Sequence, residues 1–140
     1  MAGLRALAVG LGLLAAGPSP VAAQELVYFH DRGCPYCEQW EAEIGPMYGK
    51  TWEAERFPLR GVALHDDIPP DLTIDRSVQF TPTFVLVDEA GTEIGRVTGY
   101  NSEWFWAFLD EEIRRYDAAR IADGETPDAP SPCLTTPAAC

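Results

Sequence analysis

The sequence predicts one α/β domain built on a four-stranded mixed sheet flanked by helices. Apolar runs and helix-like patterns follow one another in the order β-α-β-(short α)-β-β-α. A strand, a crossover helix and a second strand form a right-handed parallel unit. The segment 88–91 (DEAG) has the composition of a tight turn, so the last two strands form an antiparallel hairpin. A chain of 140 residues is long enough for one such domain.

The first 23 residues have the pattern of a cleavable signal peptide. Arg5 precedes an apolar stretch at 7–16, Gly17-Pro18 interrupts it, and small residues occupy 21–23. A membrane-spanning helix needs roughly 20 continuous apolar residues, and this run is shorter. We therefore expect a mature chain that begins at Gln24 and is exported to the periplasm, with an uncleaved anchor as the alternative.

The charge of the chain is strongly acidic. Ten Lys and Arg residues, one of them Arg5, stand against 22 Asp and Glu, which gives a formal net charge of −12. Such a chain repels nucleic acid and anionic membrane surfaces. The composition thus excludes nucleic acid as a partner and membrane insertion of the mature chain, and we expect a soluble monomer.

The first half of the domain carries a strand, a helix and a second strand. Residues 26–30 (LVYFH) read as a buried strand. From Cys37 onward, Trp40 and Ile44 follow at helical spacing, and Gly45-Pro46 should end or kink this helix. Residues 59–64 (LRGVAL) predict the next strand. Two prolines lie within 66–80, where 72–78 suggests one or two helical turns.

The second half carries the hairpin and a final helix. Residues 83–87 (TFVLV) are the strongest strand signal, and 92–98 alternates as its partner would. Asn101 or Ser102 is expected to cap a helix that runs to about Arg120. One side of that helix is apolar, at positions 105, 108, 109, 113 and 116. Its aromatic residues at 104, 105, 106 and 108 are expected to lie mainly in the core, with Trp106 the most exposed. The domain is thus expected to span 24–122, and 123–140 to be a Pro-rich tail with two cysteines.

The segment Cys34-Pro35-Tyr36-Cys37 lies where the first strand passes into the first helix. Unpaired backbone N–H groups and the helix dipole favour an anion there, so the pKa of the Cys34 thiol should be lowered. Pro35 suits the first helical position, where its missing N–H has no partner to lose. Cys37 returns to the same helix end and should be less exposed. This pattern predicts that Cys34 attacks a partner disulfide and Cys37 resolves the mixed disulfide.

Neighbouring residues could adjust this chemistry. Arg32 would favour the Cys34 thiolate, and Asp31 beside His30 would disfavour it. The alternative is that these three are ordinary loop residues.

Metal binding and a purely structural disulfide are the two alternatives to redox chemistry. Cys34 and Cys37 could complete a zinc site with His30, or with Cys133 and Cys140. A copper carrier would use His30 or His65, although neither has a neighbouring ligand pattern. However, six residues separate Cys133 from Cys140, whereas zinc motifs usually have two to four. The sequence therefore favours redox chemistry without a metal. The tail cysteines are expected to form a small local disulfide, with a second redox relay as the alternative.

Two motifs together resemble the thioredoxin superfamily. They are the tetrad CPYC, typical of glutaredoxins, and FTPTFVLVD at 80–88, which is similar to the superfamily's cis-proline loop. The resemblance covers about residues 25–117 and implies a minimal thioredoxin-like fold. It also implies a cis bond between Thr81 and Pro82, which would pack against the cysteine pair and present Thr81 to an extended partner peptide. Tyr36, exposed beside Pro35, would shape the same contact.

Departures from the family pattern narrow the resemblance. Gly33 stands where ordinary thioredoxins have Trp, the first β-α unit is missing, and residues 99–103 differ from the glutathione-holding signature of glutaredoxins. An APLR-like segment, FTPTFVLVD at 80–88 and the aromatic segment SEWFWAFL at 102–109 make the chain similar to the SoxS-like group of short periplasmic thioredoxins, which is associated with bacterial sulfur oxidation.

The resemblance implies an exported thiol–disulfide oxidoreductase without a bound cofactor. It would reduce a disulfide, or keep a cysteine reduced, in a periplasmic partner protein. A membrane thiol donor of the CcdA or DsbD type would supply its electrons. A dithiol oxidase or isomerase is the alternative within redox chemistry.

Overall fold

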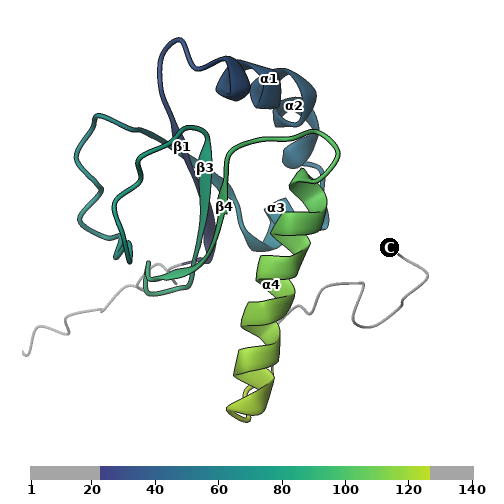
Figure 1. Cartoon of the computed structure of the whole chain (residues 1–140). Coiled ribbons are helices and arrows are strands. Elements are labelled where there is room, and N and C mark those ends of the chain that lie inside the picture. The colour runs from purple at the N-terminus through teal and green to yellow at the C-terminus, as the bar shows by residue number, and fades with distance from the viewer. Residues whose placement is uncertain (1–22, 127–140) are drawn as a thin grey trace, which may run out of the picture.

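A computed structural model describes residues 23–126, which form one sheet with helices packed against it (Figure 1). In chain order the elements are β1 (Glu25–His30), α1 (Pro35–Glu43), α2 (Gly45–Tyr48), α3 (Trp52–Arg56), β2 (Leu59–Ala63), β3 (Thr83–Val87), β4 (Glu93–Thr98) and α4 (Phe105–Ala122). The predicted signal peptide and most of the predicted tail, including Cys133 and Cys140, lie outside the described residues.

The sheet is mixed, as predicted, with the strand order β2-β1-β3-β4. β1 pairs in parallel with β2 and antiparallel with β3, and β4 pairs antiparallel with β3. The central strands β1 and β3 are buried, except at the two ends of β1, and mostly apolar because both of their faces are covered. The cysteine segment follows the end of β1, and the Thr81-Pro82 segment precedes the start of β3.

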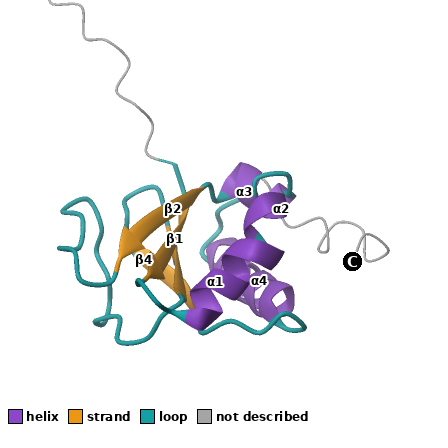
Figure 2. Cartoon of the chain, turned by 90° about the horizontal axis from the view of Figure 1, so that it is seen from above, coloured by secondary structure: helices purple, strands orange, loops and turns teal. Residues whose placement is uncertain are grey.

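The helices α1 to α4 gather on one face of the sheet (Figure 2). Aromatic rings fill the space between this face and the helices. Phe84 of β3 lies 5.0 Å from Trp40 of α1 and 4.9 Å from Phe105 of α4, measured between ring centroids. Tyr28 of β1 stacks on the same Phe84 ring at 5.2 Å. Burial of such large rings contributes most of the packing energy of a small core.

The long segment between β2 and β3 covers the opposite face of the sheet. Leu72 is buried there against β-strand residues, with Ile74 and Val78 packed beside it. The expected helical turns at 72–78 are absent, so that prediction was wrong. Thr73 instead forms a parallel bridge with Thr92, donating to the Gly91 carbonyl and accepting from the Glu93 amide, both at 2.9 Å. Those backbone groups therefore pair with the hairpin rather than with a helical turn.

Two short helices, α2 and α3, were not predicted. Gly45-Pro46 does end α1, but the proline then occupies the first turn of α2, a position that it tolerates. Thr51 caps α3 by accepting a hydrogen bond from the Ala54 amide at 3.4 Å. The hydroxyl of Tyr48, at the end of α2, donates to the carbonyl of Phe57, just after α3, at 2.8 Å. This hydrogen bond links the end of α2 to the end of α3.

The final helix α4 begins at Phe105, later than predicted. Asn101 does accept hydrogen bonds from the Glu103 and Trp104 amides, at 3.0 and 3.2 Å, but it closes a turn before the helix. Its buried stripe runs through positions 105, 109, 113 and 117. Trp104 and Phe108 lie off that stripe and are each 54% exposed, so their expected place in the core was wrong. Trp106, expected to be the most exposed, is partly buried and stacks on Tyr48.

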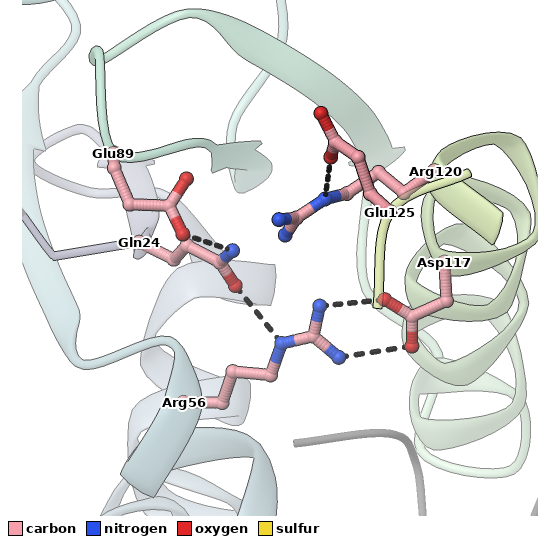
Figure 3. A network of polar contacts seen from close by, with 6 residues as sticks. All are labelled: Gln24, Arg56, Glu89, Asp117, Arg120 and Glu125. Carbon is pink, nitrogen blue, oxygen red and sulfur yellow. Dashed lines mark hydrogen bonds and ion pairs between the residues drawn. The ribbon is translucent and has the colours of Figure 1, made fainter. Parts of the chain in front are cut away.

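A polar network joins the start of β1 to α3 and α4 (Figure 3). The Arg56 guanidinium pairs with the Asp117 carboxylate and also donates to the side chain of Gln24 at 2.9 Å. Gln24 in turn donates to Glu89 in the β3–β4 turn at 2.7 Å.

No helix of the described part of the chain is long and apolar enough to cross a membrane.

Candidate redox site

Cys34 and Cys37 form a disulfide at the N-terminus of α1, with their Cα atoms 5.2 Å apart. Cys34 is the N-cap, with an extended backbone, and Pro35 opens the helix. The Cys37 amide points at the Cys34 sulfur, 3.1 Å away. In the reduced protein, this amide and the helix dipole would stabilise a Cys34 thiolate.

The two cysteines differ in their exposure to solvent. Cys34 is 9% exposed and Cys37 only 2%. Tyr36 between them is 59% exposed, because position 36 points away from the sheet. Both cysteines belong to the aromatic core cluster under α1, and Cys37 is the more deeply buried of the two. A partner can therefore approach Cys34 more readily than Cys37.

The Thr81–Pro82 peptide bond is cis. Pro82 is buried, and its carbonyl accepts the Gly99 amide at 2.7 Å, while the Thr83 hydroxyl donates to the Phe80 carbonyl at 2.8 Å. In the antiparallel register of β1 and β3, Phe29 lies opposite Thr83. The end of β1 and the start of β3 therefore share one edge of the sheet, which brings the Thr81-Pro82 segment to the same end as the cysteine segment.

The charged residues before Cys34 have separate surroundings. His30 stacks on Tyr28, with ring centroids 5.1 Å apart. The Asp31 carboxylate lies 3.2 Å from Nε2 of His65 and accepts the Arg32 amide at 2.7 Å. The Arg32 side chain is exposed and makes no ion pair within the described residues. Asp31 is therefore already engaged, whereas the Arg32 charge remains available.

Two tyrosine–carboxylate pairs hold α1, and neither was predicted from the sequence. Tyr28 donates to Glu41 at 3.0 Å, and Tyr100 donates to Glu43 at 2.6 Å. Burial, together with the Glu41 carboxylate, raises the pKa of Tyr28 well above its ordinary value. Burial and then Glu43 raise the pKa of Tyr100 to about 12, and the same hydrogen bond lowers the pKa of Glu43. The only sign of these pairs in the sequence was the acidic character of α1, which carries Glu38, Glu41 and Glu43.

A cavity of about 350 Å³ adjoins the segment before Pro82, and it too was missed. It is lined by Arg76, Ser77, Gln79, Phe80, Thr83, Arg96 and Thr98. These residues come from β3, β4 and the loop before β3, so no single stretch of sequence predicts the cavity. Arg96 pairs with Glu93 at 2.7 Å and donates to the Arg76 carbonyl at 2.9 Å.

Among residues 23–126, no group of three or more His, Cys, Asp or Glu side chains is arranged to hold a metal ion. The zinc set that would combine Cys34 and Cys37 with Cys133 and Cys140 falls partly outside those residues. Within the described part, both thiols of the motif are consumed by their own disulfide.

Comparison with known proteins identifies the fold and the family. The periplasmic thioredoxin SoxS from Paracoccus pantotrophus is 40% identical over 66% of this chain and 97% of its own, with a TM-score of 0.63. A thioredoxin-fold protein from Helicobacter pylori is 23% identical, covers 73% of this chain and 74% of its own, and has a TM-score of 0.52. No curated protein sequence matches the chain. The family model described as "Thioredoxin-like domain" matches residues 22–112. With a Cys-x-x-Cys disulfide at the helix N-terminus and this match over most of its length, the chain belongs to the thioredoxin-like domain family.

Proposed function

We propose that this thioredoxin-like redox protein is a thiol–disulfide oxidoreductase that reduces a disulfide, or keeps a cysteine reduced, in a periplasmic partner. The observation that carries the proposal is the Cys34–Cys37 disulfide at the N-terminus of α1, with Cys34 the more exposed residue. A helix N-terminus lowers the pKa of a thiol, and the thiolate is the nucleophile in disulfide exchange.

The proposed reaction transfers two electrons to the partner. The Cys34 thiolate attacks one sulfur of the partner disulfide, whose S–S bond breaks and whose second sulfur leaves as a thiolate and takes a proton. Cys37, after losing its proton, then attacks the Cys34 sulfur of the mixed disulfide. The partner leaves as a dithiol, and the Cys34–Cys37 disulfide is formed again. No bound cofactor takes part.

Four residues are proposed to position the partner. The Thr81 backbone would pair with an extended segment of the partner, and Pro82 would hold Thr81 beside the cysteines. Pro35 and Tyr36 would contact the same segment from α1. The shared sheet edge of the two segments and the exposure of Tyr36 support this assignment.

The likeness to the periplasmic thioredoxin SoxS supports a periplasmic location. The role in sulfur oxidation is proposed from the resemblance of the sequence to the SoxS-like group. In this proposal residues 1–23 are a signal peptide, and a membrane thiol donor of the CcdA or DsbD type restores the dithiol. Cys133 and Cys140 would form a local disulfide in the tail.

The test is a redox titration of the mature protein against dithiothreitol buffers, with free thiols alkylated and counted by mass. The wild type and the Cys133→Ser/Cys140→Ser variant should both show a two-electron transition at about −270 mV, the value typical of thioredoxin. A potential of about −120 mV would favour an oxidase or isomerase over a reductase. Thiols that resist oxidation and retain zinc or copper would overturn the redox proposal.

A further inference from the structure

Gln24, the residue at which the mature chain is proposed to begin, is anchored in the fold. It is only 7% exposed, although it directly precedes the first strand. Its amide nitrogen donates to Glu89 at 2.7 Å, and its amide oxygen accepts from Arg56 at 2.9 Å (Figure 3). Two residues further on, the Leu26 amide donates to the Pro58 carbonyl at 3.0 Å. Side-chain and backbone contacts therefore fix the start of the mature chain.

Two carboxylates of the β3–β4 turn lie close to the backbone nitrogen of Gln24. The antiparallel register pairs Glu25 with Val87, and one further step along both segments places Gln24 opposite Asp88. Opposed Cα atoms in such a pair are about 4.5–5.5 Å apart. The Glu89 carboxylate is separated from the same nitrogen only by one hydrogen bond and one glutamine side chain. Both carboxylates thus lie within about one Debye length, roughly 8–10 Å, of this nitrogen.

A cavity of about 250 Å³ adjoins this nitrogen. Its lining includes Ala23 and four acidic residues, Glu25, Asp71, Asp88 and Glu89. The nitrogen of Gln24 is bonded directly to the carbonyl carbon of Ala23, so it lies at the wall of the cavity. As long as this nitrogen belongs to a peptide bond, it carries no charge to balance the carboxylates.

The carboxylates of this cavity are only partly neutralised. Arg60 pairs with Glu25 at 3.2 Å and with Asp71 at 2.6 Å. Within residues 23–126, neither Asp88 nor Glu89 makes an ion pair. The negative charge that remains is therefore that of the β3–β4 turn.

The helices packed at this end of the sheet supply no further cation for the turn. Arg56 of α3 is balanced by Asp117, and Arg120 of α4 pairs with Glu125 at 2.7 Å. Burial raises the pKa of Tyr116 on α4 above its ordinary value, so this side chain is neutral at pH 7. Among the described groups, the charges of the turn are thus left without a partner of their own.

We propose that removal of residues 1–23 supplies the missing cation, the α-ammonium group of Gln24, and that the carboxylates of Asp88 and Glu89 bind it. Hydrolysis of the Ala23–Gln24 bond leaves a carboxylate on the departing peptide, and the proton passes to the new amine of Gln24. The mature chain is thereby stabilised at the start of β1 in a way that its precursor is not. This inference rests on the proposed export of the protein, because it gives the processed amino terminus a structural role.

The experiment compares two forms of the mature protein that differ by two alanines at the amino terminus. One begins at Gln24 and the other at Ala22, which moves the ammonium group by up to about 7 Å and keeps the side chain of Gln24. Both are released from a fusion protein by a protease that leaves no extra residue. Intact mass verifies that Gln24 has not cyclised with loss of ammonia, which would remove the amine. At pH 7 and low salt, the form that begins at Gln24 should have a Tm higher by about 2–4 °C.

A pH profile separates the charge of the ammonium group from any steric effect of the two alanines. Nearby carboxylates favour the charged amine, so its pKa should be raised in the folded state. The stabilisation is fully present below the ordinary pKa of an α-amino group, roughly 8, and is lost as the pH rises through the raised pKa. The Tm difference should therefore vanish above about pH 10, and at pH 7 it should shrink in about 1 M salt.

Matched variants assign the effect to the two carboxylates. Asp88 accepts the Ala90 and Thr92 amides through one oxygen, and asparagine retains such an acceptor. In Asp88→Asn/Glu89→Gln, the Tm difference between the two forms should fall at least about twofold, because both charges are lost. Glu103→Gln, an exposed change beyond the opposite end of β4, should leave the difference unchanged.

The outcomes separate this inference from the proposed function. Equal Tm values for the two forms, or a difference that persists above about pH 10, would overturn the bound ammonium. A difference of full size in the double variant would overturn it as well. None of these results alters the redox chemistry, which is titrated on the same samples. If protein recovered from the periplasm of producing cells begins at a residue other than Gln24, the proposed signal-peptide boundary is wrong and this inference fails with it.

Discussion

Arg56 and Asp117 form a two-point ion pair in the interior between α3 and α4. Their N–O distances are 2.6 and 2.9 Å, and the side chains are 8% and 0% exposed. Bidentate pairs of this kind fix the relative orientation of the two elements that carry them. Because Gln24 also binds Arg56, the same pair holds the residue just before β1 (Figure 3).

Removing one charge of this pair should be strongly destabilising. Asp117→Asn leaves the Arg56 guanidinium buried without its carboxylate, and we expect a loss of about 3–5 kcal/mol in the free energy of unfolding. The control is Arg115→Gln, which breaks only exposed pairs on α4 and should cost less than about 1 kcal/mol. Urea denaturation of the oxidised proteins measures both. A loss in Asp117→Asn no larger than in the control would contradict the expectation.

The hydrogen bond from Tyr100 should set the titration of Glu43. In Tyr100→Phe the pKa of Glu43 should rise toward its ordinary value, because that hydrogen bond is the largest cause of its lowering. Because the pKa of Glu43 is lowered in the folded state, its ionised form stabilises the fold at pH values above the ordinary pKa of Glu. This stabilisation is lost as the pH falls through the lowered pKa. The variant should therefore lose stability at neutral pH but not in strong acid. NMR titration of the Glu43 carboxyl carbon checks this. Tyr28→Phe, which affects Glu41 instead, is the control, and an unmoved Glu43 in Tyr100→Phe would refute the assignment.

Asp110 should destabilise the fold at neutral pH. Burial, and then the charge of Glu53, raises the pKa of its carboxyl. Within the described residues, one buried oxygen of each of these two carboxylates lacks a hydrogen-bond partner. Because the pKa of Asp110 is raised in the folded state, its protonated form stabilises the fold at pH values below the ordinary pKa of Asp. This contribution is lost as the pH rises through the raised folded-state pKa. Asp110→Asn should thus be more stable than the wild type at pH 7, by a margin that shrinks in acid.

Thermal unfolding between about pH 3 and pH 7 measures this margin. Glu103→Gln, at an exposed position before α4, is the control and should follow the wild type throughout. A margin for Asp110→Asn that is constant across the pH range would show that the effect is not one of ionisation.

Gly91 should tolerate alanine less well than Gly99. Both glycines have positive φ, +76° and +85°, so alanine at either position should cost about 1–2 kcal/mol of backbone strain. A Cβ at Gly91 would in addition overlap the carbonyl oxygen of Asp71, whereas one at Gly99 would meet open space. Urea denaturation of Gly91→Ala and Gly99→Ala compares them directly. Equal losses would mean that the segment at Asp71 moves aside without cost.

The order of elements along the chain, the parallel pairing of β1 with β2 and the antiparallel β3–β4 hairpin followed from patterns within the sequence, whereas the strand order β2-β1-β3-β4 and the antiparallel β1–β3 pair did not. The runs at 26–30 and 83–87 are buried on both faces, which makes their strand signal continuous and clear. The prediction of helical turns at 72–78 was wrong because the apolar residues of this segment do not recur with a helical period. They cover one face of the sheet, and the backbone of Thr73 pairs with the β3–β4 hairpin. The exposed rings of Trp104 and Phe108 were misplaced because four aromatic residues within five positions cannot all face one side of a helix.

The cysteine pair could be found from the sequence because its chemistry needs residues three positions apart at a helix N-terminus. The Arg76 cavity and the two tyrosine–carboxylate pairs could not be found in this way. Tyr100 and Glu43, for example, are separated by 57 positions, and only the packing of α1 against the segment after β4 brings them together. Such contacts depend on tertiary structure and leave no local periodicity.

The covering segment between β2 and β3 is fastened to the hairpin at Thr73, Asp75 and Arg76 before any partner arrives. Ordering a flexible loop during association would cost conformational entropy. Here that ordering has already occurred during folding, so the loss of freedom on docking falls mainly on the partner chain. A flexible tail or linker in the partner could then adapt to a nearly rigid surface, and the rate of capture would depend on encounter rather than on rearrangement of this protein.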